Sequence, residues 1–280
     1  MSDATVGPQQ AKIRASGSSF YAGMRVLPKA EREAMFAIYA FSRAVDDIAD
    51  ETTAPRAPRR AELETWRNDI EAVYRSSPPS RAAFLSDPVQ RFGLRKQDFL
   101  TIIDGMEMDV AEDIRAPDLA KLDLYCERVA SAVGRLSIKI FGMEEQPGFE
   151  LAHQLGRALQ LTNILRDLDE DAALGRLYLP REFLEEAQIP ISDPAVVIAS
   201  PAIDGPCRAL ASMAHGHYAR ADLLMQSRPR GLLRAPRLMS AVYSRVLAKM
   251  ERAGWGPPRR RARIGKSELI FTVLRYGLTG

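Results

Sequence analysis

Two acidic clusters, each with two aspartates four residues apart, are the residues of this chain best suited to chemistry. Asp46 and Asp50 form the first pair, and Asp167 and Asp171 form the second. On a helix, residues four apart share one face, with their Cβ atoms about 6 Å apart. Like charges at this spacing repel each other and weaken the helix. We therefore expect a cation between the clusters, with two solvated helix faces as the alternative.

The donor atoms in both clusters are carboxylate oxygens, with no His or Cys beside them. Such donors favour hard ions, Mg²⁺ first and Mn²⁺ as a second choice. Mg²⁺ typically takes one or two carboxylates, keeps several waters and bridges to substrate phosphates. The clusters therefore predict several metal ions that hold a diphosphate, with the ligands Asp46, Asp50, Asp167 and Asp171.

An apolar stripe at steps of three and four residues leads into the first cluster: Met35, Ile38, Tyr39, Ser42, Asp46 and Asp50. On a surface helix the charges would lie opposite the apolar side. The pattern instead predicts a helix that lines an apolar cavity with carboxylates at its mouth. Arg43, one turn before Asp46, either pairs with that aspartate or binds a phosphate oxygen.

The second cluster has two amides ahead of it on the same helical stripe, Gln160 and Asn163. Buried amides are costly unless they form hydrogen bonds. They are therefore either a satisfied pair in the core or ligands of the bound molecule. Arg166 is, with Arg43, a candidate for contacting the diphosphate.

The apolar periodicity predicts helices almost throughout the chain, and strand-like alternation is scarce. We expect one all-α domain over residues 1–280, with residues 1–15 flexible and loops near 76–80 and 190–206. The predicted helices are 30–50, 60–75, 96–113, 118–141, 148–172, 181–188, 206–227 and 236–253.

Four motifs resemble those of the squalene/phytoene synthase family. They lie at residues 18–21, 39–50, 125–134 and 160–171, the last followed by Tyr178 and Pro180, and they occur in the family's order. The resemblance implies the isoprenoid synthase fold, a helical bundle around a central apolar cavity. Within the family, the stretches 16–21, 105–109 and 130–137 most resemble the branch that makes presqualene diphosphate for bacterial hopanoids.

The resemblance implies a transferase that condenses two farnesyl diphosphates head-to-head into presqualene diphosphate and releases pyrophosphate. Other squalene or hopanoid pathway enzymes would act on the product, and no NADPH is expected; the chain also lacks a glycine-rich nucleotide fingerprint. A phytoene, dehydrosqualene or squalene synthase is one alternative. A non-catalytic assembly or scaffold relative, a group that tends to lose the aspartates, is another.

The resemblance also assigns roles to individual residues. Phe20, Tyr39 and Tyr125 match catalytic positions that line the family's site, and core packing is the alternative for each. Tyr125 matches a tyrosine proposed to assist proton transfer, for which released pyrophosphate is an equal candidate. The residues implied to bind substrate are Ser18, Ser19, Arg43, Gln160, Asn163, Arg166 and Tyr178.

One departure from the family concerns Ser18, since many relatives carry Lys or Arg at that position. Lys12, Arg14 or Arg25 are candidate replacements for the missing basic contact. The closing residues 276–278 also fit the family. The residues that close the far end of the cavity, and with them the prenyl chain length, are not identified by the sequence.

Charge and cysteine content bear on location and partners. Two cysteines, no signal peptide and no long apolar run predict a cytoplasmic protein without a membrane span. A net charge of +3 and the lack of a motif argue against nucleic acid. The basic run 259–263, with Lys266 and next to Trp255, is a solvated tail, a contact to anionic lipid at the inner membrane face, or a cover over the diphosphate.

Overall fold

The computed structural model describes residues 24, 27–226, 233–265, 268–269 and 271–272. The described part is all-α, as predicted. Its one isolated β-bridge pairs Arg115 with Leu177 in parallel. The helices are α3 (Lys29–Asp50), α4 (Arg56–Tyr74), the 3₁₀ turn η1 (Ala83–Leu85), α5 (Ser86–Phe92), α6 (Lys96–Ala111), α7 (Leu119–Cys126), the π-helical segment η2 (Glu127–Ser131), α8 (Ala132–Ile140), α9 (Glu145–Arg166), α10 (Leu168–Ala173), α11 (Arg181–Glu186), α12 (Pro194–Ile198), α13 (Asp204–Gln226) and α14 (Arg234–Ala253).

Two predicted element boundaries were wrong. The range 148–172 was predicted as one helix, but α9 ends at Arg166 and α10 begins at Leu168, with Asp167 outside both. The range 190–206 was predicted as a loop, but it contains α12. Local chemistry explains α12, because Asp193 caps the Ala195 N–H and Pro194 occupies the first helical position.

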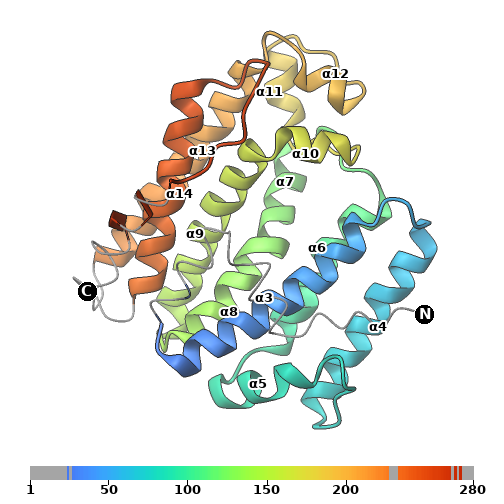
Figure 1. Cartoon of the computed structure of the whole chain (residues 1–280), viewed down its shortest axis with the longest axis vertical. Coiled ribbons are helices and arrows are strands. Elements are labelled where there is room, and N and C mark those ends of the chain that lie inside the picture. Colours follow the sequence, from blue (N-terminus) through green and yellow to red (C-terminus); the bar gives the residue numbers. More distant parts are fainter. Residues whose placement is uncertain (1–23, 25–26, 227–232, 266–267, 270, 273–280) are drawn as a thin grey trace.

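The buried apolar side chains form two clusters on either side of the bundle. One cluster is built mainly from α3, α4, α6 and α8, and the other from α9, α13 and α14. Figure 1 shows α4 on the right and α13 and α14 on the left, with α9 between them and α3 running from the lower left toward the right. Val129, in η2, packs against both clusters. The single-domain organisation over residues 1–280 stays a prediction.

Glycines allow the central helices to approach each other closely. A Cβ added to Gly134 in α8 would lie 2.9 Å from the Cβ of Ala152 in α9. One added to Gly156 in α9 would lie 2.9 Å from the backbone of Ser131 in η2. Both distances are too short for any side chain, so only glycine permits this packing. The π-helical turn, a form often found at functional sites, thus lies directly against α9.

A short backbone tie fixes the segment after α10. The Ala116 N–H donates to the Leu177 carbonyl at 2.8 Å, and the Leu177 N–H donates to the Ile114 carbonyl at 2.7 Å. These bonds hold Leu177 against residues 114–116, in the segment that follows α6. Within the described residues, no helix combines the length and apolar character needed to cross a membrane.

Candidate active site

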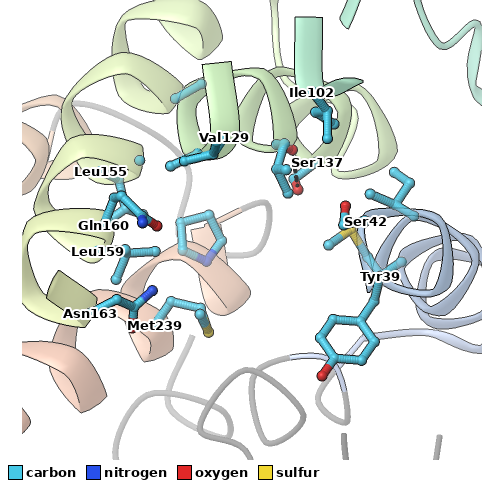
Figure 2. Close-up of a pocket in the computed structure, with 18 of the residues that line it drawn as sticks. Tyr39, Ser42, Ile102, Val129, Ser137, Leu155, Leu159, Gln160, Asn163 and Met239 are labelled. Carbon is cyan, nitrogen blue, oxygen red and sulfur yellow. Dashed lines mark hydrogen bonds between the residues drawn. The ribbon is translucent and has the colours of Figure 1, made fainter. Parts of the chain in front are cut away.

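A cavity of about 400 Å³ lies between α3, α8, α9 and α14. Its lining is mostly apolar, and Figure 2 shows Tyr39 and Ser42 on one side opposite Leu159, Gln160 and Asn163. The volume is within the range of sites that bind small organic molecules. The predicted stripe on α3 is confirmed as cavity lining from Met35 to Asp46, while Asp50 lies beyond it.

The cavity has one polar end and one apolar end. Asp46, Asn163 and Arg166 line it where α3 and α9 approach their C-termini. Met35 lines it eleven residues before Asp46, about 16 Å away along the helix axis. Phe141, Ile138 and Leu151 line it at the turn between α8 and α9, and with Met35 they form its apolar end. The sequence placed Met35 along the cavity, but it did not identify which residues close the apolar end.

The first acidic cluster lies on a continuous helix. Arg43 donates to Asp46 at 2.5 Å and to Asp47 at 2.6 Å, so the predicted pairing of Arg43 with Asp46 is present. Asp50 accepts from Arg176 at 2.6 Å, and the same guanidinium donates to the Ala49 carbonyl at 2.5 Å. Arg176 is 5% exposed and thus ties the end of α3 to the segment after α10.

The second cluster lies at a break between helices. Asp167 has non-helical backbone angles, yet its carbonyl accepts from the Asp171 N–H at 2.8 Å, which preserves one helical turn between the two aspartates. The Asp167 carboxylate accepts from Arg166 at 2.6 Å and from Arg261 at 2.8 Å. The predicted spacing of the pair is therefore kept although the helix is not continuous.

Carboxylates of the two clusters influence each other electrostatically. Burial, followed by the charge of Asp50, raises the pKa of Asp46 to about 7. Burial, followed by the charge of Asp167, raises the pKa of Asp171 to about 8, and Asp109 and Asp50 add to this shift. The Asp46 side chain keeps 35% of its surface accessible because it borders the cavity, while protein surrounds its other sides. The mouth thus concentrates negative charge that a cation would stabilise.

The donor set fits Mg²⁺ shared with a phosphate ligand. Among the residues that the structure describes, no three His, Cys, Asp or Glu side chains converge closely enough to hold an ion by themselves. Mg²⁺ commonly uses one or two carboxylates and completes its shell with water and phosphate oxygens. The carboxylates of Asp46, Asp50, Asp167 and Asp171 are candidates for that role, and this assignment stays a prediction.

Polar groups without partners face the same space. Asn163 Oδ1 and Ser42 Oγ are buried atoms with no hydrogen-bond partner, and both residues line the cavity. An unpaired buried oxygen is costly, so a satisfied amide pair in the core does not describe Asn163. These atoms are available to a bound molecule.

Three functional candidates were not predicted. Asp109 accepts hydrogen bonds from Tyr125 and Tyr178, Arg176 binds Asp50, and Tyr243 lines the cavity on α14. Asp109 falls on the apolar stripe of α6 that runs through Phe99, Ile102 and Met106, which is the signal that would have found it. Arg176 and Tyr243 offered no such signal, because only the folded chain brings them to the site.

The structure places the described site candidates in two layers. Tyr39, Arg43, Tyr125, Gln160, Asn163 and Arg166 line the cavity. Tyr178 lies behind Tyr125, with the two rings stacked at 4.8 Å. The remaining sequence candidates fall outside the described residues: Ser18, Ser19, Phe20, Lys12, Arg14, Arg25, Lys266, residues 276–278 and residues 1–15, for which flexibility was predicted.

The basic run folds onto the second cluster. Arg261 binds Asp167 at 2.7 Å and Glu170 at 3.2 Å, and Arg259 binds Asp169 at 2.8 Å. Trp255 is buried and donates to the Leu165 carbonyl at 3.0 Å, which anchors the run to α9. The interpretation of a wholly solvated tail is therefore wrong for Arg259 and Arg261, because both form ion pairs. Arg260, Arg261 and Arg263 are all exposed.

Comparison with known proteins agrees with this geometry. The family described as squalene/phytoene synthase matches residues 13–268. A presqualene diphosphate synthase from Zymomonas mobilis is 56% identical over 95% of this chain and 91% of its own length. One from Rhodopseudomonas palustris is 53% identical over 98% of both chains. A crystal structure of squalene synthase from Alicyclobacillus acidocaldarius superposes with a TM-score of 0.78 at 25% identity, over 89% of this chain and 94% of that one. The chain therefore belongs to the squalene/phytoene synthase family.

Proposed function

We propose that this protein is a prenyltransferase that condenses two farnesyl diphosphates head-to-head into presqualene diphosphate and releases pyrophosphate. The observation that carries the proposal is an apolar cavity whose mouth holds carboxylates with raised pKa values. An apolar chain and a metal-bound diphosphate fit these two ends. The relatives named presqualene diphosphate synthase, which match nearly the whole chain, support the choice of product.

The polar end would bind and orient the diphosphate. Mg²⁺ (or Mn²⁺) bound at Asp46, Asp50, Asp167 and Asp171 would supply the positive charge that makes the diphosphate a leaving group. Arg43 and Arg166 line the same end and would donate to diphosphate oxygens. Gln160 and Asn163 add amide donors and acceptors at the boundary with the apolar part.

The apolar part would protect and direct the allylic cation. Its lining excludes water, which would otherwise capture the cation. The rings of Tyr39, Tyr125 and Tyr243 line the cavity, and their faces can stabilise positive charge. The double bond of the second farnesyl chain would attack the cation, and loss of a proton would close a cyclopropane. The second diphosphate would stay on the product for other pathway enzymes, and no NADPH is required.

The proposal extends to location. We place the protein in the cytoplasm with a peripheral contact to the inner membrane face, because its substrates and product are apolar lipids. The exposed Arg260 and Arg263 lie in the basic run beside the second cluster, where anionic headgroups would attract them. Sedimentation with anionic vesicles, lost in an Arg260→Glu/Arg263→Glu variant, would support the contact; equal sedimentation of both proteins would contradict it.

Product analysis tests the proposed reaction. Purified protein is incubated with Mg²⁺ and farnesyl diphosphate, without NADPH, and phosphorylated products are identified by mass spectrometry. We expect a C30 monodiphosphate with a cyclopropane, and none with EDTA. Phytoene from geranylgeranyl diphosphate alone would instead assign a phytoene synthase. No turnover of either substrate would favour the scaffold alternative.

A further inference from the structure

Behind the cavity wall, three buried side chains form one hydrogen-bonded group. The Asp109 carboxylate on α6 is 4% exposed. Tyr178 donates to its Oδ1 at 2.7 Å, and Tyr125 donates to its Oδ2 at 3.2 Å. Tyr125 lines the cavity, whereas Asp109 and Tyr178 lie behind it. Tyr125 therefore lies next to the cavity and Asp109 lies behind it. Tyr178 binds Oδ1, the carboxylate oxygen that Tyr125 does not bind.

A carboxylate so deeply buried is costly unless it is well paired. Within the described residues, Asp109 forms no ion pair, and its two bonded partners are neutral phenols. Burial raises the pKa of Asp109 to about 6, although the nearby charge of Arg176 opposes the shift. Burial also raises the pKa of both tyrosines well above 10. At neutral pH the group is thus mainly an ionised carboxylate between two phenol donors.

We propose that Asp109 is the final acceptor of the proton lost in cyclopropane closure and acts through Tyr125. This inference rests on the proposed function. Closure breaks a C–H bond at C1 of the ionised farnesyl unit, and the electron pair forms the last ring bond to the cationic carbon of the second unit. The proton passes to Tyr125 Oη, while the original Tyr125 proton passes to Asp109 Oδ2. Tyr125 ends neutral, Asp109 ends as a carboxylic acid, and the proton returns to water after product release.

The geometry explains why the phenol alone would not suffice. A neutral Tyr125 that accepts a proton must give up its own. Its hydroxyl lies 3.2 Å from Asp109 Oδ2 and 3.3 Å from the Tyr178 hydroxyl, and Asp109 is the one carboxylate among these two acceptors. Tyr178 binds the other carboxylate oxygen, and its ring stacks on Tyr125 with 24° between the planes. Asp109 touches no cavity surface, so it is a positioning residue that acts through Tyr125.

The test is the isosteric Asp109→Asn variant, assayed with farnesyl diphosphate and with the same substrate carrying two deuterium atoms at C1. Loss of a positioned proton acceptor should lower kcat by about 10²- to 10⁴-fold. Proton removal should then limit the rate, so the deuterium effect on kcat should exceed that of the wild type. More than one pyrophosphate should be released per C30 product, because some cations are lost to water. Asp109→Glu should restore part of kcat.

Matched controls separate this role from a structural one. Asp98→Asn removes another buried carboxylate of α6, which is 2% exposed and bound to Arg135 at 2.6 Å. We expect lower stability for it but a wild-type isotope effect. An Asp109→Asn protein with a wild-type isotope effect and one pyrophosphate per product would overturn the inference. If the Asp109→Asn protein does not fold, the same deuterium effect on kcat is measured for Asp109→Glu instead. Wild-type protein that forms no C30 diphosphate would instead refute the proposed function.

Discussion

The two acidic clusters share one aspartate spacing but are built differently. Asp46 and Asp50 lie within the continuous helix α3, whereas Asp167 lies at the break between α9 and α10. Each cluster pairs with one nearby and one distant arginine. The first binds Arg43 on its own helix and Arg176 from the segment after α10. The second binds the adjacent Arg166 and Arg261 from the basic run. The clusters share a pair of carboxylates one turn apart. In the second cluster, one hydrogen bond from the Asp171 N–H to the Asp167 carbonyl preserves that turn.

Arginines offset the negative charge of the aspartates in each cluster. Both clusters combine a local arginine with a distant one, but the distant partner differs: Arg176 for the first cluster and the basic run for the second. In both, one aspartate still has a strongly raised pKa. The comparison predicts that the clusters act as one unit on the ligand but depend on different parts of the chain.

The largest expected effect comes from removing one carboxylate of either pair. Asp46→Asn and Asp171→Asn should each lower kcat by about 10³-fold or more, because stabilisation of the leaving diphosphate is worth several kcal/mol. Steady-state pyrophosphate release measures the loss, and circular dichroism should remain that of the wild type. Glu170→Gln, an exposed acid in the second cluster, is the matched control and should stay within a few-fold. Full activity of either Asn variant would remove that cluster from the site.

A smaller effect separates the two arginines. Arg43 lines the cavity and should contact the diphosphate, so Arg43→Ala should cost about 10²-fold in kcat/KM, the order of a lost charged hydrogen bond. Arg261 is 41% exposed, and Arg261→Ala should cost about tenfold or less, mainly in KM. The kcat/KM and KM of both variants are measured at low and at high salt. Equal losses would show that the basic run is as much part of the site as α3.

The smallest effect concerns stability and pH. Asp46 and Asp171 have folded pKa values of about 7 and about 8, above the ordinary 3.8. Their contribution to stability is therefore full below about pH 4 and is lost as pH rises through 7 to 8. Without metal, Asp171→Asn should raise Tm at pH 8 by at least about 2 °C, and the rise should be smaller at pH 5. A lower Tm of Asp171→Asn than of the wild type at pH 8 would contradict the accumulation of negative charge at the mouth of the cavity. Differential scanning fluorimetry with EDTA measures this.

Sequence patterns predicted the parts of the site that follow helical periodicity. The stripe from Met35 to Asp46 lines the cavity because its spacing fixes one face of α3. The amides of Gln160 and Asn163 line it for the same reason on α9. The family resemblance added Tyr125 and Tyr178, which periodicity alone did not single out.

Tertiary packing decided the rest. Arg176 reaches Asp50 because backbone hydrogen bonds hold the next residue, Leu177, beside the segment that follows α6. Arg261 reaches Asp167 because Trp255 anchors its segment to α9. The apolar end of the cavity depends on how α3 and α8 pack, because that brings Met35 and Phe141 to the same cavity. No local signal encodes these pairings, so they could not be predicted from spacing.

The most direct test of the account is a double-mutant cycle on ligand binding. Binding of the unreactive analogue farnesyl thiodiphosphate is measured by calorimetry, with Mg²⁺ and with EDTA, for wild type, Asp46→Asn, Asp171→Asn and the double variant. If both clusters hold one metal–diphosphate assembly, each single change should remove the Mg²⁺-dependent affinity, and the double variant should bind no more weakly than either. Independent, additive losses would contradict a shared site.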